Sequence, residues 1–135
     1  MTTHELRAAI RDAGLRATHQ RVTVLGLLAS RGEPMSQTDV SARLAGPRER
    51  STVYRNLSAL ARAGLVRRFT LGDRVWRFEY AGHSERHPHF VCTSCGKVTC
   101  VAAAKLVVPR VRAPRAVRRG EVEVQLRGLC DACCQ

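Results

Sequence analysis

Two Cys-x-x-Cys pairs constrain the fold of this chain more than any other feature of its sequence. Cys92 and Cys95 form the first pair, Cys130 and Cys133 form the second, and 34 residues lie between them. Each pair presents two thiolates from one tight turn, and two pairs supply the four ligands of a tetrahedral zinc ion. We therefore predict a structural zinc site that ties the C-terminus back to the segment around Cys92, so that metal loss loosens this part of the chain.

Two other interpretations of these cysteines stay open, namely a redox dithiol and coincidental burial. A redox site usually places one Cys-x-x-Cys at a helix start in a βαβ context, and no such context is evident here. Cys134, next to Cys133, is either a bystander or a replacement ligand.

A second set of potential metal ligands lies within 22 residues, beside a polar segment. Side chains two apart in a strand point to the same side, so His87 and His89 can converge on one ion. Imidazole and thiolate favour zinc over iron(II), manganese or magnesium, while copper(I) and nickel stay open. We predict a regulatory divalent-metal site here, with zinc as the expected ion and exposed histidines as the alternative. The candidate ligands are Glu79, His83, His87, His89 and Cys100.

The first 65 residues show the apolar spacing of four helices. Leu6 and Ile10 belong to the first, Thr18 can cap the second, and Ser36 with Asp39 matches a capping box for the third. In the fourth, Val53, Leu57 and Leu60 share one face, and the opposite face carries side chains suited to phosphates and bases. An ordinary solvated helix face is the competing interpretation. The opposite face carries Arg50, Thr52, Tyr54, Arg55, Ser58 and Arg62, and the candidate DNA contacts of this helix are Arg50, Ser51, Thr52, Tyr54 and Arg55.

The segment "LVRRFTLGDRVWRFEY" (65–80) alternates around Gly72-Asp73 and predicts a β-hairpin with a tight turn. Helices followed by a basic two-stranded wing are typical of a winged helix-turn-helix. In that arrangement one helix enters the major groove, and wing arginines such as Arg67, Arg68 and Arg74 can reach the DNA backbone.

The formal charge of +12 causes self-repulsion and favours an anionic partner. Double-stranded DNA is the first candidate and a membrane surface the second, although no apolar run approaches membrane-spanning length. Without an apolar signal core the protein is expected in the cytoplasm, where six cysteines favour thiolates and metal over disulfides. We expect strands at 89–92 and within 121–130, the second with one buried face, whereas 101–120 stays ambiguous.

Four stretches of this chain resemble the ferric uptake regulator (Fur) family of metal-responsive repressors. They are "GLRATHQRVTVL" (14–25), "STVYRNLSALARAGLV" (51–66), "HPHFVCTSCGK" (87–97) and "CDAC" (130–133). The resemblance implies an α+β fold: a winged helix-turn-helix domain (1–80), a hinge (81–87), and a small α/β dimerisation and metal-binding domain (88–135) holding the four-cysteine zinc site.

The resemblance also implies a homodimer on palindromic operators, with no membrane and no small-molecule substrate as partners. Tyr54 and Arg55 would contact DNA, and His87 and His89 would belong to a sensory site. Arg21, in the first of the four stretches, is counted with the candidate DNA contacts.

Several positions depart from the pattern of the family. Pro34 stands where a sensory histidine is often found, and Cys100 replaces an acidic ligand. Val122 lies near the place of another histidine, and Pro88 separates His87 from His89. A thiolate ligand favours the zinc uptake branch over iron and peroxide sensors. The alternative is a constitutive or thiol-redox-controlled DNA-binding regulator of the same fold with structural zinc only. An enzyme is not expected, because we find no nucleophile–base arrangement and no phosphate loop.

Overall fold

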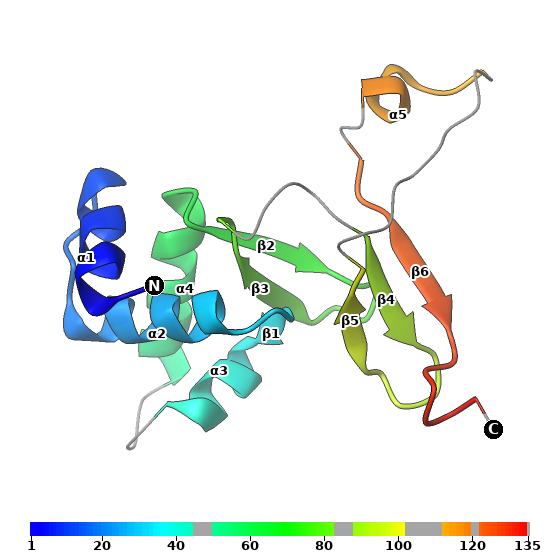
Figure 1. Cartoon of the computed structure of the whole chain (residues 1–135), viewed down its shortest axis with the longest axis horizontal. Coiled ribbons are helices and arrows are strands. Elements are labelled where there is room, and N and C mark those ends of the chain that lie inside the picture. The colour runs from blue at the N-terminus through cyan, green and yellow to red at the C-terminus, as the bar shows by residue number, and fades with distance from the viewer. Residues whose placement is uncertain (45–49, 83–87, 102–111, 120–121, 135) are drawn as a thin grey trace. The chain divides into compact units, whose positions relative to one another are not determined.

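The computed structural model describes residues 1–44, 50–82, 88–101, 112–119 and 122–134. The chain divides into two compact units, Met1–His83 and Ser84–Gln135, and each is described by itself (Figure 1). In the described residues, no helix combines the length and apolar character needed to cross a membrane.

Four helices build most of the first unit. The side chains of Thr2, Thr18 and Ser36 each accept a hydrogen bond from a backbone N–H in the first turn of a helix, which satisfies donors that the helix itself leaves unpaired. The predicted caps at Thr18 and at Ser36 with Asp39 are thereby confirmed. The helices are α1 (Thr3–Asp12), α2 (His19–Ser30), α3 (Gln37–Arg43) and α4 (Arg50–Arg62).

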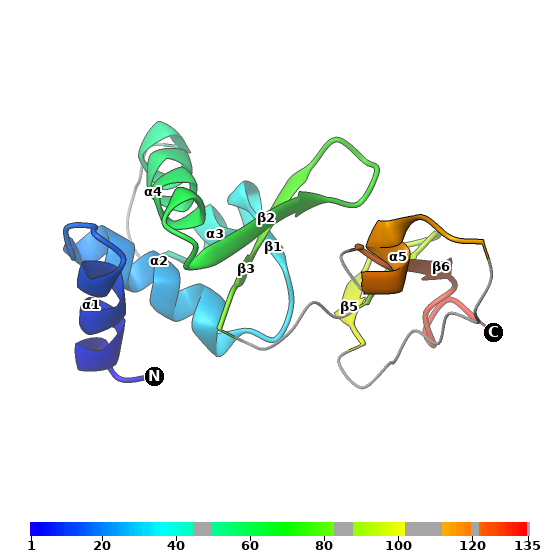
Figure 2. The same cartoon turned by 90° about the horizontal axis from the view of Figure 1, so that it is seen from above.

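A small antiparallel sheet completes the first unit. Its strands are β1 (Met35–Ser36), β2 (Val66–Thr70) and β3 (Trp76–Tyr80), in the order β1-β3-β2. The sequence indicated only a break between α2 and α3, but Met35 pairs with Phe78 there and adds a third strand. Figure 2 shows the β2–β3 hairpin extending away from the four helices as a wing.

The predicted tight turn at Gly72-Asp73 is wrong. The last paired residues are Thr70 and Trp76, so residues 71–75 form a wider loop. Asp73 organises this loop, because its Oδ1 accepts a hydrogen bond from the backbone N–H of Val75 at 3.2 Å and from the Arg77 guanidinium at 3.0 Å. Arg74 has a positive φ of 61°, and its side chain is exposed at the tip of the wing.

The hydrophobic core of the described residues lies almost entirely in the first unit. Apolar side chains from all four helices and from β1, β2 and β3 form one cluster, and Ile10, Leu25, Leu57, Leu60 and Phe78 in it are fully inaccessible. Among the described residues of the second unit, only Pro88 and Cys92 are buried. The described part of the second unit therefore contributes little apolar burial to its stability.

The described residues of the second unit form a three-stranded sheet and one short helix. The strand order is β5-β4-β6, with β4 antiparallel to β5 and parallel to β6. Strands at 89–92 and within 121–130 are confirmed, but the predicted buried face is wrong, because Gln125, Leu126 and Arg127 are exposed. The strand begins only after the alternating Glu-Val-Glu-Val. The elements are β4 (His89–Cys92), β5 (Val98–Cys100), α5 (Arg115–Arg119) and β6 (Gln125–Gly128).

Candidate metal centres and nucleic-acid interface

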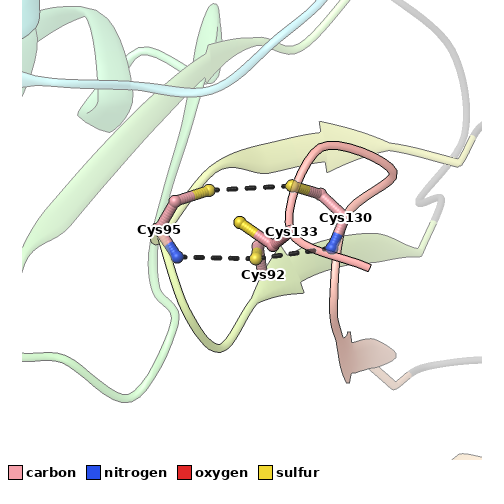
Figure 3. A group of neighbouring side chains, drawn as sticks. All are labelled: Cys92, Cys95, Cys130 and Cys133. Carbon is pink, nitrogen blue, oxygen red and sulfur yellow. Dashed lines mark hydrogen bonds between the residues drawn. The ribbon is translucent and has the colours of Figure 1, made fainter. Parts of the chain in front are cut away.

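The parallel pairing of β4 with β6 brings the two Cys-x-x-Cys pairs together. Cys92 ends β4 opposite Gly128 of β6, and Cys130 follows two residues later. A Cβ on Gly128 would lie 3.3 Å from the Phe90 ring, so a side chain there would press against the neighbouring strand. After Cys95 the chain turns through Gly96, whose φ of +74° suits glycine. Each pair thus projects from a tight turn toward the same point (Figure 3).

The four sulfur atoms are spaced as a tetrahedral metal site requires. The Sγ atoms of Cys92, Cys95, Cys130 and Cys133, here called the four-cysteine cluster, all lie within 4.8 Å of one another. The Sγ atoms of Cys95 and Cys130 are 3.8 Å apart. A tetrahedron of metal–sulfur bonds of about 2.3 Å has edges of about 3.8 Å. The cluster therefore fits one tetrahedral thiolate-bound ion, with all four positions filled by protein.

Backbone amides are already directed at one of these sulfurs. The N–H groups of Cys95 and Cys130 donate to Cys92 Sγ at 3.5 Å and 3.4 Å. These two hydrogen bonds lower the pKa of the Cys92 thiol to about 6, since they favour its charged form. The hydrogen bond between Cys133 and Cys130 raises the pKa of Cys133 to about 12. The fold therefore favours the thiolate form of Cys92. Four thiolates so close together would repel one another, so a bound cation is required to hold them.

His89 and Cys100 face each other across β4 and β5. They are register partners in this antiparallel pair, and directly opposed side chains project from the same face of a sheet. Both are half-buried. An imidazole and a thiol at one position form a soft pair of metal ligands.

The structure gives the position of only one of the other three candidate ligands. Glu79 lies on β3 in the first unit, where its carboxylate is 3.5 Å from Arg67 Nε. His83 and His87 lie outside the described residues. Within one unit, therefore, the structure brings together two of the five predicted ligands.

The exposed face of α4 carries most of the predicted DNA contacts. Val53, Leu57 and Leu60 point into the core. Arg50, Ser51, Tyr54 and Arg55 are exposed, whereas Thr52 is half-buried. Arg55 Nε donates to the carbonyl of Ser51 one turn earlier at 3.3 Å. A cationic and hydroxyl-bearing surface on a single helix suits insertion into the major groove.

Two arginines named from the sequence are held by contacts inside the first unit. Arg21, on α2, is half-buried and donates to the carbonyl of Arg16 at 3.0 Å. Arg67 pairs with Glu79 and donates to the carbonyl of Ala81 at 3.3 Å. Arg21 and Arg67 are therefore engaged in contacts within the unit, whereas Arg74 is exposed and available to DNA.

The sequence interpretation missed one side chain beside the predicted contacts. Trp76 lies under the guanidinium of Arg68, whose Cζ is 3.8 Å from the indole centroid. The alternation of the hairpin could have indicated this contact. When Thr70 pairs with Trp76, Arg68 becomes the diagonal neighbour of Trp76 on the same face. Diagonal neighbours in a sheet remain within reach of long and aromatic side chains.

Known proteins resemble this chain over nearly its whole length. The model of the ferric uptake regulator family matches residues 12–123. The peroxide operon regulator of Bacillus subtilis is 33% identical over 104 residues, which cover 73% of this chain and 70% of that protein. The ferric uptake regulation protein of Synechococcus elongatus is 27% identical over 141 aligned positions, covering 98% and 95% of the two chains.

Solved structures share the fold at lower sequence identity. The Helicobacter pylori ferric uptake regulator, described as having three functional metal-binding sites, superposes with a TM-score of 0.71 and 20% identity, covering 100% of this chain and 95% of that one. The holo form of XcZur superposes with a TM-score of 0.56 and 22% identity, covering 98% of each chain.

Proposed function

Because the chain belongs to the ferric uptake regulator family and is a metal-responsive transcriptional regulator, we propose that it is a repressor that senses zinc. Zinc in the four-cysteine cluster would be structural, and a second zinc ion would be regulatory. A homodimer carrying both would bind a palindromic operator through α4 and the wing.

The choice of zinc as the regulatory metal rests on the pairing of His89 with Cys100 across β4 and β5. A thiolate and an imidazole are soft to borderline ligands that suit zinc, whereas iron(II) and manganese sensors rely on oxygen and nitrogen donors. His83, His87 and Glu79 are the remaining candidate ligands of this site. Relatives in this family differ in the signal they respond to, as the peroxide regulator and the ferric regulator illustrate, so the ligand set is the feature that separates them.

Zinc is also the expected ion of the four-cysteine cluster. A tetrahedral site filled by four thiolates leaves no open position for substrate or water, which is typical of structural zinc. When bound, the ion would supply a cross-link between the end of β4 and the C-terminal turn.

Regulation would follow from a change in the population of DNA-competent dimers. Two recognition helices must reach half-sites at a fixed spacing, so an ion that restricts the 81–87 connection raises operator affinity. The metal can raise the occupancy of the operator only to the extent that it binds the DNA-competent dimer more tightly than the other arrangements.

Replacing Cys100 with serine is expected to remove the regulatory zinc and leave the structural zinc in place, because the four-cysteine cluster does not include it. Wild-type protein should fall from about two zinc ions per chain to about one on dialysis against a moderate chelator, and Cys100→Ser should hold about one throughout. Zinc should raise wild-type operator affinity by roughly 5-fold to 150-fold, the usual size of such a coupling. Metal analysis measures the zinc content. Titration with a duplex selected from a random-sequence library measures the affinity with and without zinc.

Cys134→Ser is the matched control, because it also removes one thiol outside the four-cysteine cluster. It should keep both zinc ions and the full metal response. Equal operator affinity with and without zinc in the wild-type protein would refute zinc sensing.

The second candidate is a constitutive or thiol-redox-controlled regulator with structural zinc only. Two thiols outside the four-cysteine cluster, on Cys100 and Cys134, and Pro34 in place of a sensory histidine favour it. Intact mass under mild peroxide separates the two candidates, because a redox switch forms an oxidised product at low peroxide and a metal sensor does not.

A further inference from the structure

Arginines on the wing and at the end of α4 differ in whether an acidic residue pairs with them. Arg67 is paired with Glu79, and Arg77 is paired with Asp73 at 2.8 Å. Arg68, exposed on β2, has no carboxylate partner among the residues that the structure describes, and neither does Arg62 in the last turn of α4. Acidic partners therefore neutralise Arg67 and Arg77, whereas no described carboxylate neutralises Arg62 or Arg68, whose charges can bind an external anion.

Arg62 and Arg68 line one groove between α4 and the wing. This groove, here called the helix–wing groove, has a volume of about 500 Å³ and is open to solvent. Phe78 enters the core, Arg68 lies directly opposite it on β2, and Trp76 lies two residues nearer the tip of the wing on the same face. Its lining residues are Tyr54, Ser58, Ala61, Arg62 and Arg68.

We propose that the helix–wing groove holds a phosphodiester of the operator backbone, with Arg62 and Arg68 donating to its oxygens and Trp76 positioning Arg68. The proposal rests on the proposed function, since it requires that α4 and the wing bind duplex DNA. It adds an anion-binding subsite to the contacts predicted on the exposed face of α4.

The stacking of Arg68 on Trp76 leaves its hydrogen-bond donors available. A guanidinium that lies over an indole uses its face for the cation–π contact, while its five N–H donors lie in the plane of the group. The side chain is therefore oriented before DNA arrives, and less conformational entropy is lost when a phosphate binds. Trp76, with 44% of its surface exposed, gains burial when the backbone covers it.

The geometry of DNA places a backbone strand between these two elements. In a winged helix the recognition helix enters the major groove, and the wing arginines can reach the adjacent DNA backbone. The sugar–phosphate strand that borders the major groove on this side then passes between helix and wing. Tyr54, a predicted DNA contact, lines the helix–wing groove, so the groove opens on the same face of α4.

Replacing Arg68 with alanine is expected to weaken binding to every duplex alike. One lost phosphate contact lowers the slope of log affinity against log salt by about 0.9 per protomer, which corresponds to roughly fivefold in affinity near 0.15 M salt. The zinc-loaded protein would be titrated with a labelled mixed-sequence duplex of about 30 base pairs, three helical turns, at several salt concentrations. Arg62→Ala should behave in the same way, whereas Arg31→Ala, an exposed arginine at the end of α2, should leave the slope unchanged.

Trp76 is the only tryptophan in the chain, and it contacts Arg68 of the groove, so its fluorescence reports on the surroundings of Arg68. Saturation with duplex should change its emission. Trp76→Ala should weaken binding by about two- to fivefold, the size of an exposed cation–π contact, and Trp76→Phe should restore most of the loss because an aromatic face remains.

The outcomes separate this proposal from the proposed function. A wild-type protein that binds no duplex at any salt concentration overturns both. Normal binding with an unchanged salt slope in Arg68→Ala and Arg62→Ala, or with unaltered Trp76 emission, overturns the groove and leaves the repressor intact. Circular dichroism of each variant, matched to wild type, assigns a changed slope to lost contact and not to unfolding.

Discussion

Replacing Cys130 with serine is expected to release the structural metal and unfold the second unit, while the first unit remains folded. Structural zinc contributes an apparent binding free energy of about 10–16 kcal/mol. Against this, Pro88 and Cys92 are the only buried residues among those described in the second unit. So little apolar burial in the described strands does not offset the entropy of ordering them. The metal ion is therefore expected to supply most of its stability.

The measurement is hydrogen exchange followed by mass spectrometry, together with metal content. In Cys130→Ser the amides of β4, β5 and β6 should exchange at the rate of an unfolded chain, and α2 and α4 should stay protected. Excess chelator should reproduce this pattern in the wild-type protein. Cys134→Ser is the control, because Cys134 lies beside the cluster but outside it. Protection of β4 in a metal-free Cys130→Ser protein would show that the sheet is stable without the ion.

Local signals predicted the helices well. Thr18, and Ser36 with Asp39, marked helix starts because a hydroxyl there satisfies backbone donors whatever the tertiary fold. The apolar face of α4 followed from its period alone. The four cysteines could be grouped because a tetrahedral ion needs two ligand pairs, and this requirement does not depend on the path of the chain between them.

Features set by particular side-chain contacts or by pairing between distant segments could not be predicted. Strand β1 is only Met35–Ser36, too short to show any period, and it exists because β3 offers it an edge. The wing loop depends on hydrogen bonds to Asp73, which a Gly-Asp pair in a sequence does not reveal. Neighbouring arginines look equivalent in "RRF", yet Arg67 faces Glu79 and Arg68 stacks on Trp76.

The same limit applies to the candidate metal ligands. His89 and Cys100 could be named from residue type, but their direct opposition depends on the register of β5, a strand of three residues. Residue type predicts which atoms can bind a metal, whereas register decides which of them meet. His83 and His87 lie outside the described residues and stay predictions.

Replacing Phe78 with alanine is expected to destabilise the first unit by about 3–5 kcal/mol, as deletion of a buried aromatic ring usually does. Phe78 is fully inaccessible and lies on the central strand of the sheet, between Met35 of β1 and Arg68 of β2. The cavity would open between the helices and the base of the wing. A domain of this size has a total stability of only about 5–15 kcal/mol. A fall in Tm on the order of 20 °C is therefore expected, measured by circular dichroism in the zinc-loaded protein.

Trp76→Ala is the matched control, since it removes a larger aromatic side chain from the same strand at a position that is 44% exposed. It should change the Tm by a few degrees at most, because little cavity is created. Phe78→Ala should retain the structural zinc and protection of β4 while it loses affinity for DNA, the reverse of the pattern expected for Cys130→Ser. A Phe78→Ala protein within a few degrees of wild type would mean that the wing is anchored elsewhere, through β2 and its contacts with α4.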